Sequence, residues 1–110
     1  MKRRRVVVTE NFERNLDGLE AFRAHHPGGF QGALQKLYGQ VLPLLKKQGH
    51  LGRLHGTGRP IVERIRLRLG GGVLREVLVD EYVMLYLAGD DQLVLLSIRH
   101  QRELDFDFGD

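Results

Sequence analysis

The fold is decided by residues 73–98, which read VLREVLVDEYVMLYLAGDDQLVLLSI. Three apolar, β-prone runs fill this stretch, and each predicts a strand: 73–79, 82–88 and 93–98. Asp80-Glu81 separates the first pair of runs, and Gly89-Asp90-Asp91 separates the second pair. Because such short links permit only antiparallel neighbours, the stretch predicts a three-stranded meander.

Both faces of this meander carry large apolar side chains. Since side chains alternate along a strand, Leu74 and Leu78 point opposite to Val77 and Val79. In the next run, Val83, Leu85 and Leu87 likewise oppose Met84 and Tyr86. One face can pack against helices, whereas the other needs a second cover, either from the same chain or from a partner.

The residues before the meander predict a short strand followed by two helices. Val6 to Val8 is apolar and β-branched, and Thr9 or Asn11 can cap the helix that follows. Apolar residues then recur at helical spacing in two stripes. The first stripe is Phe12, Leu16, Leu19 and Phe22, and the second, within about 30–47, is Phe30, Leu34, Leu37, Tyr38, Val41, Leu42 and Leu45.

Proline and glycine divide these helices from each other and from the sheet. Pro27-Gly28-Gly29 ends the first helix, and Pro43 predicts a kink in the second because its ring crowds the carbonyl group of Gly39. Residues 49–60 are Gly-rich and predict an irregular stretch.

The stretch 61–69 fits either a strand or a helix. Arginine alternates with apolar residues as in a strand, but Pro60 suits a first helical turn and Gly70 suits a C-terminal cap, which favours a short helix. The order strand, helix, helix, strands predicts one α+β domain over residues 1–110. We expect a helical hairpin packed on a small antiparallel sheet.

Composition limits the setting in which the chain works. It has no cysteine, and no segment approaches the ~18 apolar residues of a membrane span, so we expect a cytoplasmic protein without a membrane partner. The net charge is +3, but residues 46–75 hold eight basic side chains and one acid, whereas 76–110 hold nine acids and two arginines. A basic surface of this kind attracts nucleic acid or an acidic protein.

Four stretches in order along the chain resemble the RelE/ParE family of toxins. They are Val7-Val8-Thr9-Glu10-Asn11-Phe12-Glu13-Arg14-Asn15-Leu16, Val41-Leu42-Pro43-Leu44-Leu45, Leu74-Arg75-Glu76 with Tyr82-Val83-Met84-Leu85-Tyr86 and Gly89-Asp90-Asp91, and Leu95-Leu96-Ser97-Ile98-Arg99-His100-Gln101-Arg102. The tail Leu104-Asp105-Phe106-Asp107-Phe108 is similar to that of one ParE-like subgroup.

This resemblance implies the toxin of a type II toxin–antitoxin system, of the kind also called plasmid stabilisation proteins. Such a toxin arrests bacterial growth and is neutralised by a cognate antitoxin that wraps around it in a hetero-oligomer, which would cover the second sheet face. ParE-like members inhibit DNA gyrase without nuclease chemistry. RelE-like members cut mRNA on the ribosome, so whether this chain is an enzyme stays open.

If the chain cleaves RNA, the resemblance and the residue types point to five side chains. His100 can act as acid or base, since imidazole titrates near neutral pH. Arg75, Arg99 and Arg102 can hold the phosphate, and Glu63 can act as a base. Some nuclease members carry a tyrosine at or beside the terminal histidine, where this chain has Gln101. That difference favours ParE-like inhibition of gyrase.

Other aromatic and basic residues are candidates for binding the antitoxin or the target: Arg64, Arg66, Arg68, Tyr82, Tyr86, Phe106 and Phe108. The histidines His25, His26, His50 and His55 lack the helical spacing of a metal site, so we expect neither a metal nor another cofactor. A third reading is a non-toxic nucleic-acid-binding domain, favoured by the basic stretch 46–75.

Overall fold

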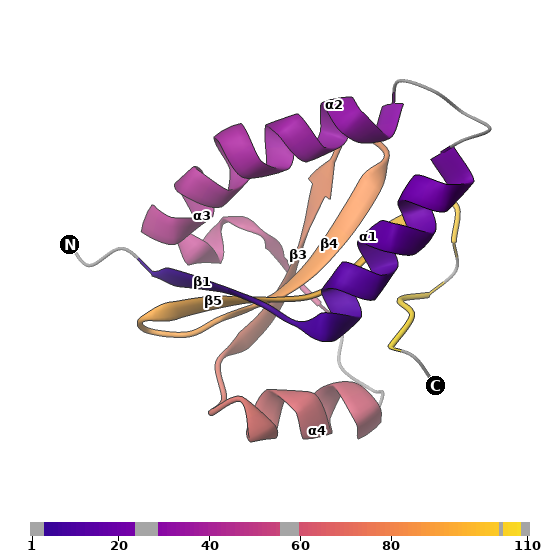
Figure 1. Cartoon of the computed structure of the whole chain (residues 1–110). Coiled ribbons are helices and arrows are strands. Elements are labelled where there is room, and N and C mark those ends of the chain that lie inside the picture. The colour runs from indigo at the N-terminus through magenta and orange to yellow at the C-terminus, as the bar shows by residue number, and fades with distance from the viewer. Residues whose placement is uncertain (1–3, 24–28, 56–59, 104, 109–110) are drawn as a thin grey trace.

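A mixed sheet of five strands, in the order β1-β5-β4-β3-β2, forms the centre of the fold (Figure 1). The computed structural model describes residues 4–23, 29–55, 60–103 and 105–108. The strands are β1 (Arg5–Val8), β2 (Arg53–Leu54), β3 (Val73–Val79), β4 (Tyr82–Ala88) and β5 (Gln92–His100).

The predicted meander is confirmed as β3, β4 and β5, which pair antiparallel. Asp80, in the first link, has a φ of 54°, a left-handed conformation that aspartate tolerates in tight turns. At the second link, Gly89 donates its N–H to the carbonyl group of Gln92 over 2.9 Å. The first two strands have the predicted bounds, whereas the last, predicted over 93–98, runs from Gln92 to His100.

The sheet is mixed, which corrects the antiparallel sheet expected from the sequence. β1 pairs with β5 in parallel register, with Val6 beside Leu93 and Val8 beside Leu95. The rule that a tight turn forces antiparallel pairing does not apply to β1 and β5, because most of the chain lies between them and a long crossover permits parallel strands.

The first helix, α1 (Glu10–Arg23), begins where the sequence predicts it. Thr9 caps it, because its hydroxyl group accepts the N–H of Phe12 over 3.2 Å and donates to the carbonyl group of Leu95 over 2.8 Å. The side chain of Phe22, and Pro27 and Gly28 of the predicted break, lie outside the described residues.

The predicted second helix consists of three consecutive segments. They are α2 (Gly29–Lys36), the π-helical segment η1 (Leu37–Val41) and α3 (Leu42–Lys47). The N–H of Leu42 reaches back to the carbonyl group of Leu37, one residue further than in an α-helix. This wider turn directly precedes Pro43, so the irregularity predicted there takes the form of a π-helical segment.

The stretch before the meander contains short elements and one further helix. η2 (Gly49–Leu51) is a single 3₁₀ turn, and residues 56–59 lie outside the described part. α4 (Pro60–Arg68) confirms the helical interpretation of the ambiguous arginine-rich stretch. Gly70, Gly71 and Gly72 follow with φ of 92°, 85° and 115°, a left-handed conformation that a side chain would strain.

Each face of the sheet is covered by a different part of the chain. α1, α2, η1 and α3 cover one side, here called the helical face (Figure 1). Its buried side chains are Phe12, Ala33, Leu37, Leu42, Leu45, Val79, Met84, Tyr86, Leu93, Leu95 and Ile98.

The opposite side, here called the second face, is covered by α4 and the C-terminal tail. Its buried side chains are Val62, Leu74, Val83, Leu85, Leu87, Val94, Leu96, Phe106 and Phe108. The second cover that the sequence requires therefore comes from the chain itself, which corrects the expectation that an antitoxin would lie directly on this face.

Candidate functional site

The five side chains expected to cleave RNA do not come together. His100 pairs with Tyr82 on the helical face, where the two rings meet edge to face at 5.4 Å. Arg99 pairs with Val83 and points to the second face. Adjacent residues of one strand project from opposite sides, so His100 and Arg99 do not share one site in this fold.

The other three candidates lie in separate places. Arg75 is opposite Tyr86 on the helical face, and its guanidinium group donates to the carbonyl group of Gly52 over 2.8 Å. Arg102 is exposed in the turn after β5. Glu63 lies on α4, where a hydrogen bond from Arg66 holds the pKa of its carboxyl group below the ordinary value.

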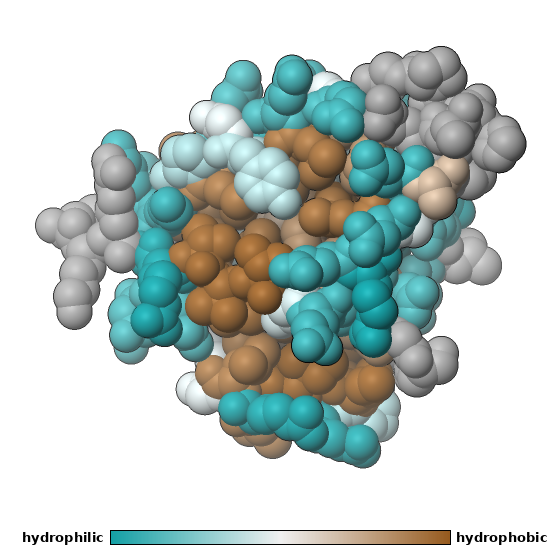
Figure 2. Space-filling view, viewed as in Figure 1, coloured by the Kyte–Doolittle hydropathy of each residue, from teal (hydrophilic) through white to brown (hydrophobic). Residues whose placement is uncertain are grey.

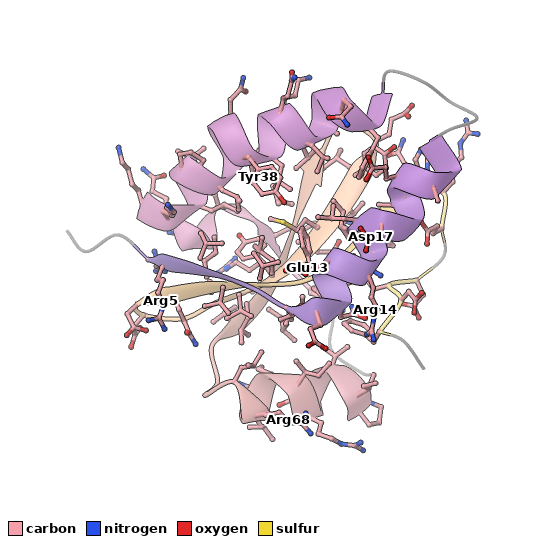
Figure 3. The ribbon with its side chains drawn as sticks, viewed as in Figure 1. Arg5, Glu13, Arg14, Asp17, Tyr38 and Arg68 are labelled. Atoms are coloured by element: carbon pink, nitrogen blue, oxygen red, sulfur yellow. The ribbon has the colours of Figure 1, made fainter. Side chains whose placement is uncertain are left out.

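The candidates for partner binding divide into exposed and buried groups. Arg64 and Arg68 are exposed on α4, and Figure 3 shows Arg68 at the outer side of this helix. Arg66 donates a hydrogen bond to the carboxylate group of Glu63 on the same helix. Tyr82 lies half-buried against Phe30.

Tyr86 belongs to the core and offers no surface to a partner. Its side chain is fully buried, and its hydroxyl group donates to the carbonyl group of Gly49 and accepts the N–H of Gly52. Burial raises the pKa of this hydroxyl group. Phe106 and Phe108 are also buried, on the second face.

The structure brings together a different set of polar side chains on the second face: Arg53, His55, Glu76 and Arg99, here called the His55 cluster. Glu76 is its centre and is only 8% exposed. Arg53 donates to one carboxylate oxygen of Glu76 over 2.6 and 2.9 Å, and Nδ1 of His55 lies 2.6 Å from the other. Pairing of β2 with β3 places Arg53 directly beside Glu76.

Burial and neighbouring groups shift the pKa of Glu76 in opposite directions. Burial alone would raise the pKa of its carboxyl group, but hydrogen bonds from His55 and Arg53 and the charges of both residues outweigh burial and lower the pKa. Glu76 is therefore a carboxylate at neutral pH, and it orients the imidazole ring of His55.

We expect this arrangement to make stability depend on pH. Because the pKa of Glu76 is lower in the folded chain than its ordinary 4.5, its stabilising contribution is present above that pH and is lost as the pH falls through the folded value. Glu76→Gln should lower the free energy of unfolding by roughly 1–3 kcal/mol at pH 7, and less as the pH falls. Urea denaturation from pH 7 to 3 measures this, with Glu20→Gln as an exposed control. A gap that stays constant over this range would contradict the assignment.

An aromatic side chain from the tail caps the His55 cluster. The ring of Phe106 meets that of His55 edge to face at 5.8 Å, and the guanidinium carbon of Arg99 lies 4.8 Å from its centre. Arg99 also donates to the carbonyl group of Glu103 over 2.8 Å. Within the described part of the chain, its buried Nε has no hydrogen-bond partner.

The tail is held in place by amide side chains of α1. Asn11 and Asn15 donate to the carbonyl group of Asp107 over 2.8 and 3.3 Å, and the hydroxyl group of Ser97 adds a contact of 3.2 Å. Asn15 in turn accepts from Ser97 and from the N–H of Ile98. Residues far apart in the sequence thus fix the position of Phe106 over the His55 cluster.

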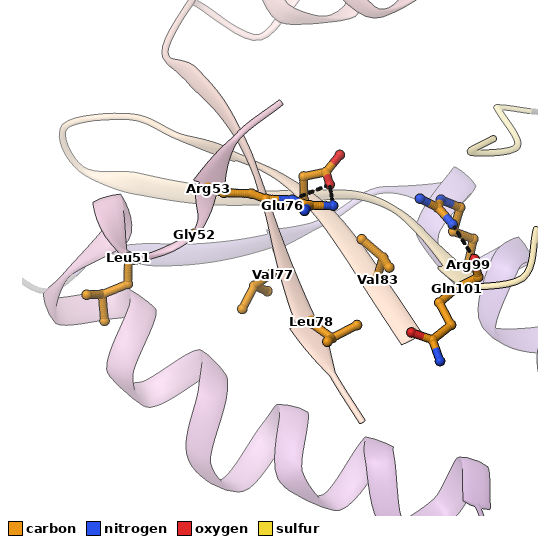
Figure 4. A pocket seen from close by; sticks show the side chains of 9 residues that line it. All are labelled: Leu51, Gly52, Arg53, Glu76, Val77, Leu78, Val83, Arg99 and Gln101. Carbon is orange, nitrogen blue, oxygen red and sulfur yellow. Dashed lines mark hydrogen bonds and ion pairs between the residues drawn. The ribbon is translucent and has the colours of Figure 1, made fainter. Parts of the chain in front are cut away.

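An open pocket of about 450 Å³ borders the His55 cluster (Figure 4). Its lining combines apolar and charged side chains: Leu51, Gly52, Arg53, Glu76, Val77, Leu78, Val83, Arg99 and Gln101. Arg53 keeps three quarters of its side chain exposed. With two guanidinium groups against one carboxylate, the pocket can accept an anionic group.

Sequence reasoning did not find Arg53, His55 and Glu76. The alternation of Arg53, Leu54 and His55 is typical of a strand, but β2 has only two residues and follows a Gly-rich stretch. Glu76 appeared only as part of the motif Leu74-Arg75-Glu76. Their meeting depends on pairing between β2 and β3, which no local pattern reveals.

A scan of protein-family models finds no match for the chain, and a search of curated proteins finds none either. In the described ranges no three His, Asp or Glu side chains gather where they could hold a metal ion. No helix within those same ranges has the length and apolar character to cross a membrane.

Proposed function

We propose that this chain is a growth-arresting toxin of the RelE/ParE kind, neutralised in the bacterial cytoplasm by a cognate antitoxin. Two features support the proposal: the resemblance of the four sequence stretches, and a strand–helix–helix–meander order that agrees with the layout expected from that resemblance. The α+β fold alone is compatible with many functions, so the proposal depends on the resemblance.

DNA gyrase is the target that we favour. The observation that carries this choice is the separation of His100 and Arg75 on the helical face from Arg99 on the second face. A toxin that inhibits gyrase by binding does not need catalytic residues gathered at one site. Binding can instead use exposed side chains distributed over the surface.

The antitoxin in this proposal contacts the outer side of α4. Arg64 and Arg68 are exposed one helical turn apart, and Leu67 between them is 64% exposed. A basic stripe with an exposed apolar residue suits an acidic, amphipathic partner segment. Because α4 already covers the second face, the antitoxin reaches the helix rather than the sheet.

A gyrase supercoiling assay with the purified chain tests the target. We expect the wild-type chain to inhibit supercoiling and to leave cleaved DNA. Leu67→Glu should inhibit equally well, but a cognate antitoxin should no longer relieve this inhibition. Leu54→Glu, changed at a similarly exposed leucine, should still be relieved by the antitoxin. Unchanged supercoiling at excess chain would contradict the gyrase proposal.

Ribosome-dependent cleavage of mRNA is the second candidate, and the His55 cluster favours it. Here His55 would transfer the proton, Glu76 would orient its ring, and Arg53 and Arg99 would hold the phosphate beside the pocket. In a translation extract, His55→Ala should then abolish mRNA cuts, whereas His50→Ala, at an exposed histidine, should leave them. Growth arrest that survives His55→Ala would exclude this candidate.

A further inference from the structure

One edge of the sheet is open in the described structure. β1 is the outer strand of the sheet and pairs only with β5 among the strands described. Figure 1 is viewed toward this edge, with α2 and α3 on one side of β1 and α4 on the other. An exposed β-branched edge is a template for pairing with another strand.

The backbone of β1 has groups available for such pairing. Arg5 and Thr9 donate their N–H groups to Asp91 and Leu95, on the β5 side. Since alternate residues of a strand direct their backbone groups to the same side, those of Val6 and Val8 point away from β5. The N–H of Arg4, which also lies an even number of residues from Val6, donates to the carbonyl group of Lys46 in α3. The open part of the edge therefore runs from Val6 to Val8.

Apolar surface lies on both sides of this edge. Within β1, Val6 is only partly buried on the helical face and Val7 only partly buried on the second face. Val8 is 40% exposed. Figure 2 shows apolar surface gathered above and below the position of β1 in Figure 1, which is typical of a protein interface.

Charge is distributed unequally along the same edge. The exposed Arg5 lies at the start of β1, and α3 ends nearby with Lys46 and Lys47. Beyond the end of β1, α1 exposes Glu10 and Glu13. Figure 3 shows Arg5 at the start of β1, and Glu13, Arg14 and Asp17 along α1. Opposite charges accompany each group, because the exposed Asp90 and Asp91 adjoin Arg5 and the exposed Arg14 follows Glu13. Each end therefore has an excess of one charge and not a single sign.

We propose that the β1 edge binds a second copy of this chain, through an antiparallel β1–β1 pair related by two-fold symmetry. In the register centred on Val7, Val6 of one copy pairs with Val8 of the other, so the free backbone groups meet. The same symmetry places the basic end of each copy beside the acidic end of the other. A surface that complements itself in this way is what a two-fold dimer requires. The proposal goes beyond the toxin function and does not depend on it.

Sedimentation velocity of the purified chain at micromolar concentration tests the dimer. The wild type should sediment as a species with twice the 12.6 kDa mass of one chain. Val8→Pro should be monomeric, because the lost N–H points away from β5 and proline suits an edge strand. Val8→Thr keeps the N–H and should remain dimeric. A monomeric wild type, or a Val8→Pro variant that still dimerises, would overturn the proposal.

A charge exchange tests the orientation of the two copies. Arg5→Glu and Glu10→Lys should each weaken the dimer by about tenfold or more, since each places like charges together. Mixing the two variants should restore a heterodimer, because the new glutamate of one copy then faces the new lysine of the other. Circular dichroism confirms that each variant folds. Failure of the mixture to associate, with both variants folded, would rule out the antiparallel arrangement.

Discussion

Gly52→Ala is expected to lower the free energy of unfolding by about 3 kcal/mol or more, a large part of the stability of a small domain. Gly52 has an extended backbone with φ of −68°, which any residue can adopt, so the constraint is space. A Cβ atom there would lie 2.3 Å from the hydroxyl oxygen of Tyr86 and 2.8 Å from the backbone oxygen of Glu76. The strand or the tyrosine must shift, and the buried hydrogen bonds of Tyr86 are then lost.

Gly18→Ala provides the matched control for this prediction. Gly18 lies within α1, and a Cβ atom added there meets nothing within 4 Å. Alanine should stabilise this helix by about 1 kcal/mol, because glycine disfavours helices. Urea denaturation followed by circular dichroism measures both variants. Equal effects at the two positions would contradict the proposed close packing around Gly52.

Asn15→Ala is expected to lower the free energy of unfolding by roughly 2–4 kcal/mol, because it leaves buried donors unsatisfied. The carboxamide oxygen of Asn15 accepts the hydroxyl group of the fully buried Ser97 over 2.6 Å and the N–H of Ile98 over 3.1 Å. Its amide group also holds the tail at Asp107. A single side chain thus joins α1, β5 and the tail.

A double-mutant cycle separates this network from a general loss of helix packing. Ser97→Ala should cost much less in the Asn15→Ala background than in the wild type, with a coupling energy of about 1 kcal/mol. Glu20→Ala, at an exposed position of the same helix, should change stability by less than about 0.5 kcal/mol. Fully additive effects of the Asn15 and Ser97 substitutions would show that the network is not coupled.

Local patterns predicted the elements of this fold more successfully than their pairing. The links at Asp80-Glu81 and at Gly89 to Asp91 specify the meander, because they are too short for anything but antiparallel strands. Pro60 and Gly70 distinguished α4 from a strand, although the alternating arginines favoured one. In each case the deciding signal lies within a few residues of the element.

Contacts between residues far apart in the sequence could not be predicted from such local patterns. The parallel pairing of β1 with β5 joins residues far apart in the chain, and so does the packing of Phe106 on His55. The sequence indicated that a second apolar face needs a cover but could not say which segment supplies it. Similarly, Arg99 and His100 are neighbours in the sequence, yet the strand separates them onto opposite faces.

The growth-arrest proposal is tested most directly by counting viable cells after the chain is induced alone in bacteria. We predict that the colony count falls sharply within a few generations and that co-induction of a cognate antitoxin restores it. Cells that accumulate the folded chain and form as many colonies as uninduced cells would contradict the proposal.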